Sequence, residues 1–244
     1  MTFTVIIPCY KQEQYLEDAV ASAAKCKGVE MISLIDDASP TWPMGDNLFD
    51  SLEASCRGVD LWLMHNVKNE GLSYARNRGF ANADSDWVLP LDADDVLVPA
   101  AFDSLPDIGS DVGFVYGSYL AFSETTQYHV TELQPDATLD SMLFSPWLPP
   151  CALVRKSAWE AVKAKNGTGY DPEVSKLGGF EDWLFWLELM ALGWKGHYTY
   201  STMWRYRRYN KGGSMRERAL QNIKAIQGYI SDKMRRLYGV HFPA

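Results

Sequence analysis

The chain has 244 residues, of which 47% are hydrophobic and 22% charged, as in an ordinary globular protein large enough to bury a core. Its formal net charge of −8 disfavours non-specific binding to nucleic acid, which requires an excess of Lys and Arg facing the phosphates. No stretch approaches the roughly 20 apolar residues of a membrane span, and the first residues lack the basic region of a signal peptide. The four cysteines show no CxxC spacing and predict neither a zinc site nor a disulfide framework, so we expect a cytoplasmic protein.

Apolar runs alternate with amphipathic stretches in residues 1–100. Runs that predict strands cover residues 3–8, 30–37, 59–65 and 86–92. Patterns that predict helices lie between them, at residues 15–25, 47–56 and 72–83. The alternation indicates βαβ units, and therefore an α/β fold with a Rossmann-like, mostly parallel central sheet flanked by helices.

Residues 101–214 are less regular. They predict strands at 111–122 and 127–133 that suggest a hairpin, a strand and then a helix at 148–162, a helix at 180–194 and a strand at 196–209. No linker or repeat divides the chain. We therefore predict one domain over residues 1–214, built from halves 1–100 and 101–214.

The tail, residues 215–244, is predicted to form a C-terminal amphipathic helix. Its apolar residues recur at helical spacing: Leu220, Ile223, Ile226, Ile230, Met234 and Leu237. We predict that this stripe packs against the domain. The alternative is an interfacial helix whose basic residues meet anionic lipid, which would give peripheral contact with the inner face of a membrane.

Polar clusters follow the four predicted strands of residues 1–100. They are Pro8-Cys9-Tyr10, Asp36-Asp37, His65 to Glu70, and Asp92 to Asp95. In open α/β sheets, ligands bind beyond the carboxyl ends of the strands. The convergence of these four clusters therefore predicts a ligand site at that edge.

The acids Asp92, Asp94 and Asp95 end an apolar strand abruptly, and like charges this close repel one another. Carboxylate oxygens suit a hard divalent cation, which often bridges to substrate phosphates. The alternative is an Asp-rich turn that caps the next segment. Position after a buried strand favours the metal.

Arg76 lies in the helical pattern that begins after Gly71. The planar guanidinium fork suits phosphate and ribose oxygens at the same sheet edge. An exposed arginine on a surface helix is the alternative.

Five segments stand in this order along the chain: VIIPCYKQEQYLEDAVAS, LIDDAS, NEGLSYARNRG, LPLDADD and GGFEDWLFWLELMALGW. Their order and approximate spacing resemble those of family 2 glycosyltransferases with the GT-A fold, over roughly residues 3–194. The resemblance implies an inverting enzyme that moves a sugar from a nucleotide sugar, expected to be UDP-linked, to an acceptor hydroxyl. It implies Mn²⁺ or Mg²⁺ as cofactor, a donor-binding half at 1–100 and an acceptor and catalytic half at 101–214.

The resemblance also implies roles for single residues. Donor-binding positions are Pro8, Tyr10, Asp36, Asp37, Asn69, Arg76, Asp92 and Arg207. Metal-binding positions are Asp92, Asp94 and Asp95, and the catalytic pair is Glu181 and Asp182, with Asp182 matching the base. Within this set, Asp37 with Asp36 would receive a base N–H, and Arg76 would approach the ribose and diphosphate.

In-line inverting transfer needs a carboxylate that takes the acceptor proton as the new bond forms. Glu181 and Asp182 follow two glycines and open a helix, where the dipole favours an ionised acid. We therefore expect Asp182 to be deprotonated at neutral pH. The alternative is a helix-start acid of purely local benefit.

Two positions depart from the family pattern. Lys11 stands where an Asn is frequent, and Tyr209 occupies the place of a late His that in many relatives reaches the metal or phosphate. Arg207, Arg208 or Lys211 would then hold the diphosphate instead. Metal dependence is accordingly a weaker expectation than the fold.

Other functions and the acceptor stay open. A sugar-1-phosphate nucleotidyltransferase would want a Gly-rich basic loop after the first strand, and PCYKQEQ contains no Gly. A non-catalytic nucleotide-sugar-binding domain would not need both Asp182 and the DxDD acids. Trp147 is a candidate for stacking on an acceptor sugar, whereas Trp183 and Trp186 are better explained as core residues.

Overall fold

The computed structural model describes residues 1–40, 46–105, 107–123, 129–135, 137–208 and 215–243. Its strands are β1 Phe3–Cys9, β2 Val29–Asp36, β3 Asp60–His65, β4 Trp87–Pro90, β5 Val96–Leu97, β6 Val112–Phe122, β7 His129–Thr131, β8 Leu153–Arg155 and β9 Lys195–Arg207. Its α-helices are α1 Leu16–Ala23, α2 Asp46–Ser55, α3 Leu72–Asn82, α4 Leu139–Phe144, α5 Lys156–Asn166, α6 Pro172–Leu177, α7 Glu181–Ala191, α8 Met215–Gln221 and α9 Ile223–Tyr238. Short 3-10 helices cover Glu13–Tyr15 and Pro99–Phe102.

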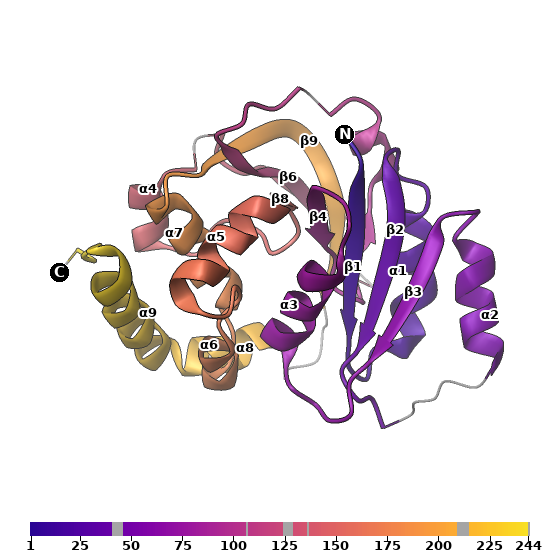
Figure 1. Ribbon diagram of the computed structural model, residues 1–244, viewed down its shortest axis with the longest axis horizontal. Coiled ribbons are helices and arrows are strands. Elements are labelled where there is room, and N and C mark those ends of the chain that lie inside the picture. Colours follow the sequence, from indigo (N-terminus) through magenta and orange to yellow (C-terminus); the bar gives the residue numbers. More distant parts are fainter. Residues whose placement is uncertain (41–45, 106, 124–128, 136, 209–214, 244) are drawn as a thin grey trace.

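The strands of the described residues form one curved, nine-stranded sheet in the order β3-β2-β1-β4-β8-β6-β9-β5, with β7 paired to β6. The β3-β2-β1-β4 part is parallel throughout, as the βαβ alternation predicts. Beyond β4 the pairing is mixed, because β8 is antiparallel to both of its neighbours whereas β6 and β9 run parallel. The long strand β9 arches over the molecule (Figure 1) and returns to the carboxyl edge of β4.

Helices cover both faces of the parallel strands. In Figure 1, α1 and α2 lie on one side of β1 and β2, whereas α3, α5 and α7 lie on the other. Alternate residues of β1 serve the two cores: Val5 and Ile7 join the α1 side and Ile6 joins the α3 side. At Gly79 a Cβ would meet Ile6 at 2.8 Å, so glycine allows α3 to press directly on β1.

The parallel register brings the strand ends level with one another. Cys9 pairs with Asp36, and Asp36 pairs with His65, so β1, β2 and β3 end along one line. The predicted strands and helices of residues 1–100 are confirmed to within a few residues. So are the hairpin of β6 and β7, the strand and helix at β8 and α5, the helix α7 and the strand β9.

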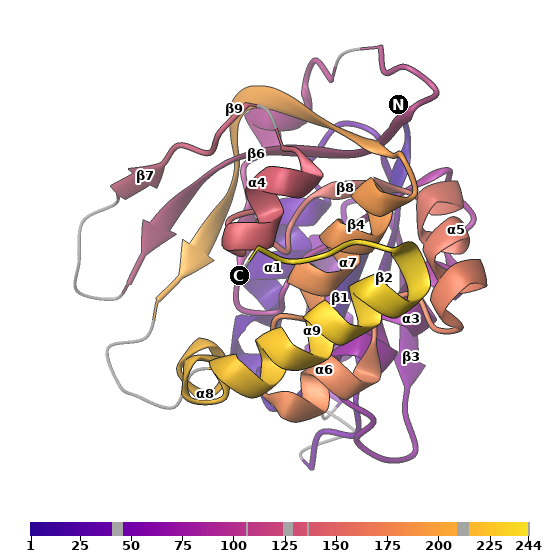
Figure 2. The same ribbon diagram turned by 90° about the vertical axis from the view of Figure 1, so that its left-hand side faces the viewer.

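The predicted tail helix is divided in two at Asn222. The side chain of Asn222 donates a hydrogen bond to the carbonyl of Leu177 at the end of α6, at 2.9 Å, and its backbone leaves the helical conformation. Side-chain bonds of this kind compete with helix continuation. Figure 2 shows α9 lying across α6, with α8 at an angle to it.

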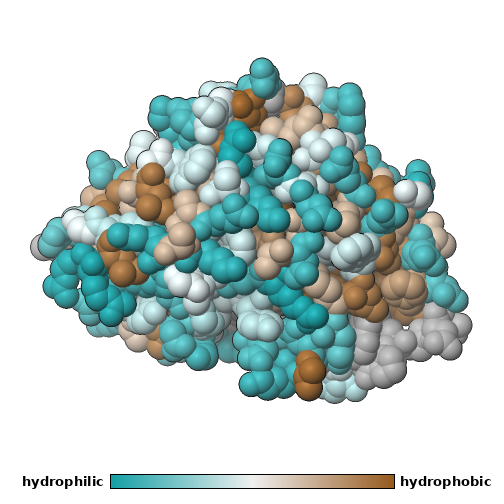
Figure 3. Space-filling model, viewed as in Figure 1, coloured by the Kyte–Doolittle hydropathy of each residue, from teal (hydrophilic) through white to brown (hydrophobic). Residues whose placement is uncertain are grey.

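The predicted apolar stripe packs against the domain along α9 but not at Leu220, which lies on α8 and is 52% exposed. Ile226, Ile230 and Met234 are fully buried in the core that contains α7. The surface over α9, at the left of Figure 3, is mainly hydrophilic. None of the described helices is long and apolar enough to cross a membrane. Peripheral contact with lipid through α9 stays a prediction, as does the division of the chain at residue 214.

Candidate active site

The loop between β3 and α3 is held by the carboxylate of Asp37, which follows β2 and is 3% exposed. One carboxylate oxygen accepts hydrogen bonds from the Asn66 side chain at 2.7 Å and from the N–H of Glu70 at 2.9 Å. The other accepts from the N–H of Gly71 at 2.7 Å, and the Asn69 side chain donates to the Asp37 carbonyl at 3.2 Å. Asp37 therefore ties the end of β2 to the entrance of α3.

Asp36 is fully buried beside it and accepts a hydrogen bond from the N–H of Ser39 at 3.1 Å. Its other oxygen lies 2.6 Å from Nδ1 of His65. From the sequence, His65 is only the first residue of one of the four polar clusters, with no role of its own. The register pair Asp36 to His65 in the parallel sheet could have revealed it, because two polar residues at level strand ends are neighbours.

Pro8 and Tyr10 lie at the end of β1 on the same edge. Pro8 is buried within the strand, whereas Tyr10, just beyond it, is 40% exposed. The ammonium of Lys11 lies 4.9 Å from the centroid of the Tyr10 ring, and the Lys11 N–H donates to Oγ of Ser39 at 3.0 Å. Tyr10 thus presents an accessible ring beside Asp36 and Asp37, where the resemblance expects a nucleotide.

A buried guanidinium joins the two acidic motifs. Arg76 of α3 is 1% exposed; one terminal nitrogen lies 2.7 Å from Oε1 of Glu181 and the other lies 2.8 Å from Oδ1 of Asp92. The Tyr170 ring packs against it, with the guanidinium carbon 5.5 Å from the ring centroid. Burial alone would lower the pKa of Arg76, but the carboxylates of Asp92 and Glu181 raise it above its ordinary value. Arg76 therefore contacts these acids from the protein interior and is not exposed to a ligand.

The turn into α7 directs Glu181, one of the two acids predicted to be catalytic, at Arg76. Gly178, Gly179 and Phe180 have φ angles of 125°, 136° and 65°. Glycine adopts positive φ readily, but at Phe180 a positive φ strains the backbone, and contacts of the side chain must offset this strain. Its ring packs edge-on against Trp183, with centroids 6.2 Å apart. The turn brings Glu181 directly onto the guanidinium.

Asp182 follows Glu181 in the first turn of α7 and keeps a partly exposed edge. The N–H of Trp183 donates to its Oδ1 at 2.9 Å. Burial, and then repulsion from Glu181, raise the pKa of Asp182 to about 7, although Arg76 opposes the shift. The expectation that Asp182 is fully deprotonated at neutral pH is therefore not met, because burial and Glu181 oppose ionisation more strongly than Arg76 and the N–H of Trp183 favour it. Near pH 7 this carboxyl is divided between its two protonation states.

The turn after β4 is fixed by Arg207 at the end of β9. The N–H of Arg207 donates to Oδ1 of Asp95 at 2.8 Å, and its Nε donates to the carbonyl of Asp94 at 2.9 Å. The Arg207 guanidinium also lies 4.5 Å from the ring centroid of Tyr15. Burial, and then repulsion from Asp92 and Asp94, raise the pKa of Asp95 well above its ordinary value.

The three predicted metal ligands have different surroundings. Asp95 is 1% exposed, whereas Asp92 and Asp94 are partly exposed. In the part of the chain that the structure describes, no three His, Cys, Asp or Glu side chains are arranged to hold a metal ion. Tyr209, at the position of the family's late His, and Lys211 lie outside the described residues.

The three tryptophans considered for sugar stacking differ in burial, as the sequence suggests. Trp183 and Trp186 are buried in the core, and Nε1 of Trp183 donates to the carbonyl of Met142 at 2.7 Å. Trp147 is partly exposed and packs edge-on against Tyr116, with ring centroids 6.1 Å apart. A role for Trp147 at the acceptor stays a prediction.

Two solved structures share this fold over most of the chain. TarS residues 1–349 of S. aureus, in complex with UDP-GlcNAc, superimposes with a TM-score of 0.65 at 17% identity, over 99% of this chain and 74% of that one. The mannosyltransferase PcManGT of Pyrobaculum calidifontis, in complex with GDP-Man and Mn²⁺, superimposes with a TM-score of 0.62 at 16% identity, over 92% of this chain and 64% of that one. At these identities the likeness shows a shared fold, which confirms the predicted GT-A architecture.

Two curated proteins are similar in sequence. The succinoglycan biosynthesis protein ExoW of Rhizobium meliloti (strain 1021) is 31% identical over 153 residues, which are 59% of this chain and 46% of ExoW. An uncharacterized glycosyltransferase of Haemophilus influenzae (strain ATCC 51907 / DSM 11121 / KW20 / Rd) is 31% identical over 106 residues, 42% of this chain and 38% of that protein. The chain thus spans less than half the length of these relatives.

The family model described as "Glycosyl transferase family 2" matches residues 4–145. The matched region includes β1 to β4, the loop held by Asp37, and both Arg76 and Asp92. More than half of the chain is covered, so this protein belongs to glycosyl transferase family 2.

Proposed function

We propose that this protein is an inverting glycosyltransferase that moves a sugar from a UDP-sugar to an acceptor hydroxyl, with Asp182 as general base. The observation that carries the proposal is the position of Arg76, which contacts Asp92 at the end of β4 and Glu181 beside Asp182. The acids of the donor side and the acids of the catalytic helix thereby converge on one buried cation. A nucleotidyltransferase would want a Gly-rich basic loop after β1, where this chain has PCYKQEQ without a glycine.

In the proposed reaction, the acceptor oxygen attacks the anomeric carbon while the bond from that carbon to the diphosphate oxygen breaks. The electron pair of the broken bond leaves with the nucleoside diphosphate. The acceptor proton passes to the carboxylate of Asp182, which is poised for this task because its pKa lies close to neutrality. Glu181 and Arg76 hold the base in place.

The residues after β4 fit a divalent cation. Mg²⁺ sites in nucleotide enzymes commonly use one or two carboxylates, with substrate phosphates completing the shell. Asp92 and Asp94 are partly exposed, and one oxygen of buried Asp95 has no hydrogen-bond partner among the described residues. We propose that Asp92 and Asp94 hold Mn²⁺ or Mg²⁺ and that Asp95 supports them from behind. Such an ion would stabilise negative charge on the departing diphosphate.

Donor contacts are proposed along the ends of β1 and β2. The accessible ring of Tyr10 would pack against the base, and the Asp36–Asp37 pair and Asn69 would shape the pocket around it. A UDP-sugar is proposed because TarS, which shares this fold, has been crystallised with UDP-GlcNAc. The GDP-Man complex of PcManGT makes GDP-sugars the necessary comparison.

The test combines binding and turnover. Calorimetry against UDP-, GDP- and dTDP-sugars, with and without Mn²⁺, identifies the donor. Slow donor hydrolysis, in which water replaces the acceptor, then reports catalysis as nucleoside diphosphate is released. Asp182→Asn is expected to lower hydrolysis at least about a hundredfold, the usual contribution of a general base, while donor Kd changes less than about threefold.

Asp140→Asn is the matched control, because Asp140 also stands in the first turn of a helix but is exposed on α4. It should retain wild-type turnover. An Asp182→Asn enzyme as active as the wild type would remove Asp182 from the mechanism. Failure to bind any nucleotide sugar would overturn the whole proposal.

A further inference from the structure

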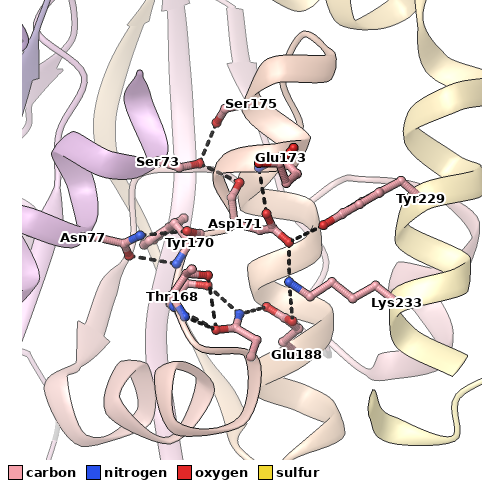
Figure 4. Close-up of polar contacts among 12 residues, drawn as sticks. Ser73, Asn77, Thr168, Tyr170, Asp171, Glu173, Ser175, Glu188, Tyr229 and Lys233 are labelled. Atoms are coloured by element: carbon pink, nitrogen blue, oxygen red, sulfur yellow. Dashed lines mark hydrogen bonds and ion pairs between the residues drawn. The ribbon is translucent and has the colours of Figure 1, made fainter. Parts of the chain in front are cut away.

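A buried charged cluster lies beside Glu188, near the C-terminal end of α7 and away from its first turn (Figure 4). Lys233 of α9, Asp171 at the start of α6 and Glu188 of α7 are 5%, 4% and 0% exposed. The ammonium of Lys233 contacts Oδ2 of Asp171 and lies 3.6 Å from Oε1 of Glu188. The reaction proposed above uses none of these three residues.

Lys233 compensates two buried carboxylates. Asp171 also accepts from the hydroxyl of Tyr229 at 2.9 Å, and Glu188 accepts from the side chain of Asn166 at 2.8 Å. Neither of these donors carries a charge. Without Lys233, the buried Asp171 carboxylate would lose its cation, and the pKa of Glu188, which Lys233 lowers, would rise further. The cluster is therefore stable only while α9 is docked.

The segment that carries Asp171 is also hydrogen-bonded to α3 on both sides of Arg76. The hydroxyl of Ser73 donates to the carbonyl of Asp171 at 2.9 Å. The Asn77 side chain donates to the carbonyl of Tyr170 at 2.7 Å and accepts from its N–H at 2.8 Å. Ser73 and Asn77 flank Arg76 along α3, and the Tyr170 ring packs against the guanidinium.

Glu188 gives the cluster a hold on α7 as well. It lies seven residues after Glu181, close to two full turns, so both side chains project from the same face of the helix. Glu181 contacts Arg76 on that face, and Glu188 contacts the Asn166 side chain and lies beside Lys233. The two helices that carry Arg76 and the catalytic pair are thus fastened to the same short segment, residues 166–171.

We propose that Lys233 is a positioning residue, which locks α7 and α3 together from α9 and so holds Asp182 and Glu181 in register with Arg76. The inference rests on the proposed function, since it names what fixes that function's base. It makes the tail helix part of the catalytic apparatus, although the helix contributes no atom to the reaction.

Lys233→Met tests the proposal, because methionine keeps most of the side-chain volume and removes the charge. Below its unfolding temperature, this variant should show kcat reduced about tenfold or more, with donor KM and Kd within about threefold of wild type. Hydrogen exchange by mass spectrometry should show faster exchange of the amides in residues 178–187. Lys224→Met, on the exposed side of the same helix, is the matched control and should change none of these quantities.

The double variant Lys233→Met/Glu188→Gln separates a loss of stability from a loss of positioning. Removing one buried carboxylate should restore much of the unfolding temperature, but kcat should stay low and exchange at residues 178–187 fast, because the link from α9 to α7 is still absent. Recovery of both wild-type kcat and wild-type exchange in the double variant would show mere charge compensation and overturn the proposal. So would wild-type values in folded Lys233→Met. A wild-type enzyme that hydrolyses no nucleotide sugar would contradict the proposed function instead, and the exchange measurement would still decide the positioning role.

Discussion

The acids at the end of β2 are buried, whereas of the acids around Arg76 only Glu181 is buried and Asp92 is partly exposed, and the two groups are stabilised in different ways. Asp37 accepts three hydrogen bonds from two backbone N–H groups and an asparagine, all neutral donors fixed by the fold. Asp92 and Glu181 instead share one guanidinium, and the second carboxylate oxygen of Glu181 has no hydrogen-bond partner among the described residues. We call Asp36, Asp37 and the loop they hold the proposed donor edge, and Arg76 with Asp92, Glu181 and Asp182 the proposed catalytic edge. The Asp37 carboxylate has hydrogen bonds to both of its oxygens, whereas the second oxygen of Glu181 can still accept a proton or meet a cation.

This contrast predicts that the catalytic edge is the more fragile of the two. Arg76→Met should lower the free energy of unfolding by about 3–5 kcal/mol, because buried Glu181 and partly exposed Asp92 lose their cation. It should also abolish transfer, since Glu181 and Asp92 would no longer be held together. Urea denaturation and donor hydrolysis measure the two effects.

Arg76→Lys sharpens the same test, because it keeps the charge but loses the fork that reaches both acids at once. It should fall between wild type and Arg76→Met in stability and in activity. Arg235→Met, on the exposed face of α9, should stay within about 0.5 kcal/mol of wild type. If Arg76→Met were as stable as this control, the guanidinium would not be what holds the two motifs together.

The raised pKa of Asp182 predicts how activity depends on pH. The base works only when deprotonated, so kcat/KM should rise with pH and level off above a midpoint near 7. Below that midpoint, activity should fall about tenfold for each pH unit. A pH profile of donor hydrolysis from pH 5 to 9 measures the midpoint, and a midpoint near 4 would mean that burial does not govern this carboxyl.

Stability should change in the opposite direction over the same range. Burial raises the pKa of Asp182, and of Glu188, to about 7 in the folded protein, whereas both have ordinary values near 4 when unfolded. The folded state therefore keeps protons that the unfolded state releases, and the free energy of unfolding falls as pH rises from about 4 to 7. Glu188→Gln removes one of the two groups that cause this pH dependence. In denaturation experiments, its free energy of unfolding should therefore fall less steeply with pH than that of the wild type, and the contacts of Asp37 should be unaffected.

Local patterns were enough to predict the donor edge. Apolar β-branched runs such as the one ending in Asp36 and Asp37 specify buried parallel strands, and parallel strands bring their carboxyl ends together whatever follows. Residues 1–100 could therefore be laid out, and their polar clusters placed on one edge, from the sequence alone.

The catalytic edge depends on contacts between distant parts of the chain. Arg76 and Glu181 are 105 residues apart, and no local periodicity marks an arginine as the partner of a particular glutamate. The pKa of Asp182 was misjudged for a related reason, since a helix start is visible in the sequence but the depth of burial is not. The break at Asn222 likewise depends on a bond to the distant residue Leu177.

Asp37→Asn gives the smallest of these effects and tests the donor edge alone. An amide keeps the shape of the side chain but places an NH₂ group against N–H donors of Glu70 or Gly71, leaving at least one of them unsatisfied. The free energy of unfolding should fall by about 1–3 kcal/mol, and loosening of the loop should raise donor KM about three- to tenfold.

The distinction between the two edges lies in which kinetic constant responds. In Asp37→Asn, kcat should stay within about threefold of wild type, because Arg76, Glu181 and Asp182 keep their contacts. Asp84→Asn, exposed after α3, serves as the control and should alter neither constant. A large loss of kcat in Asp37→Asn with unchanged KM would mean that the entrance of α3 transmits its position directly to Arg76, and the two edges would then have to be treated as one mechanical unit.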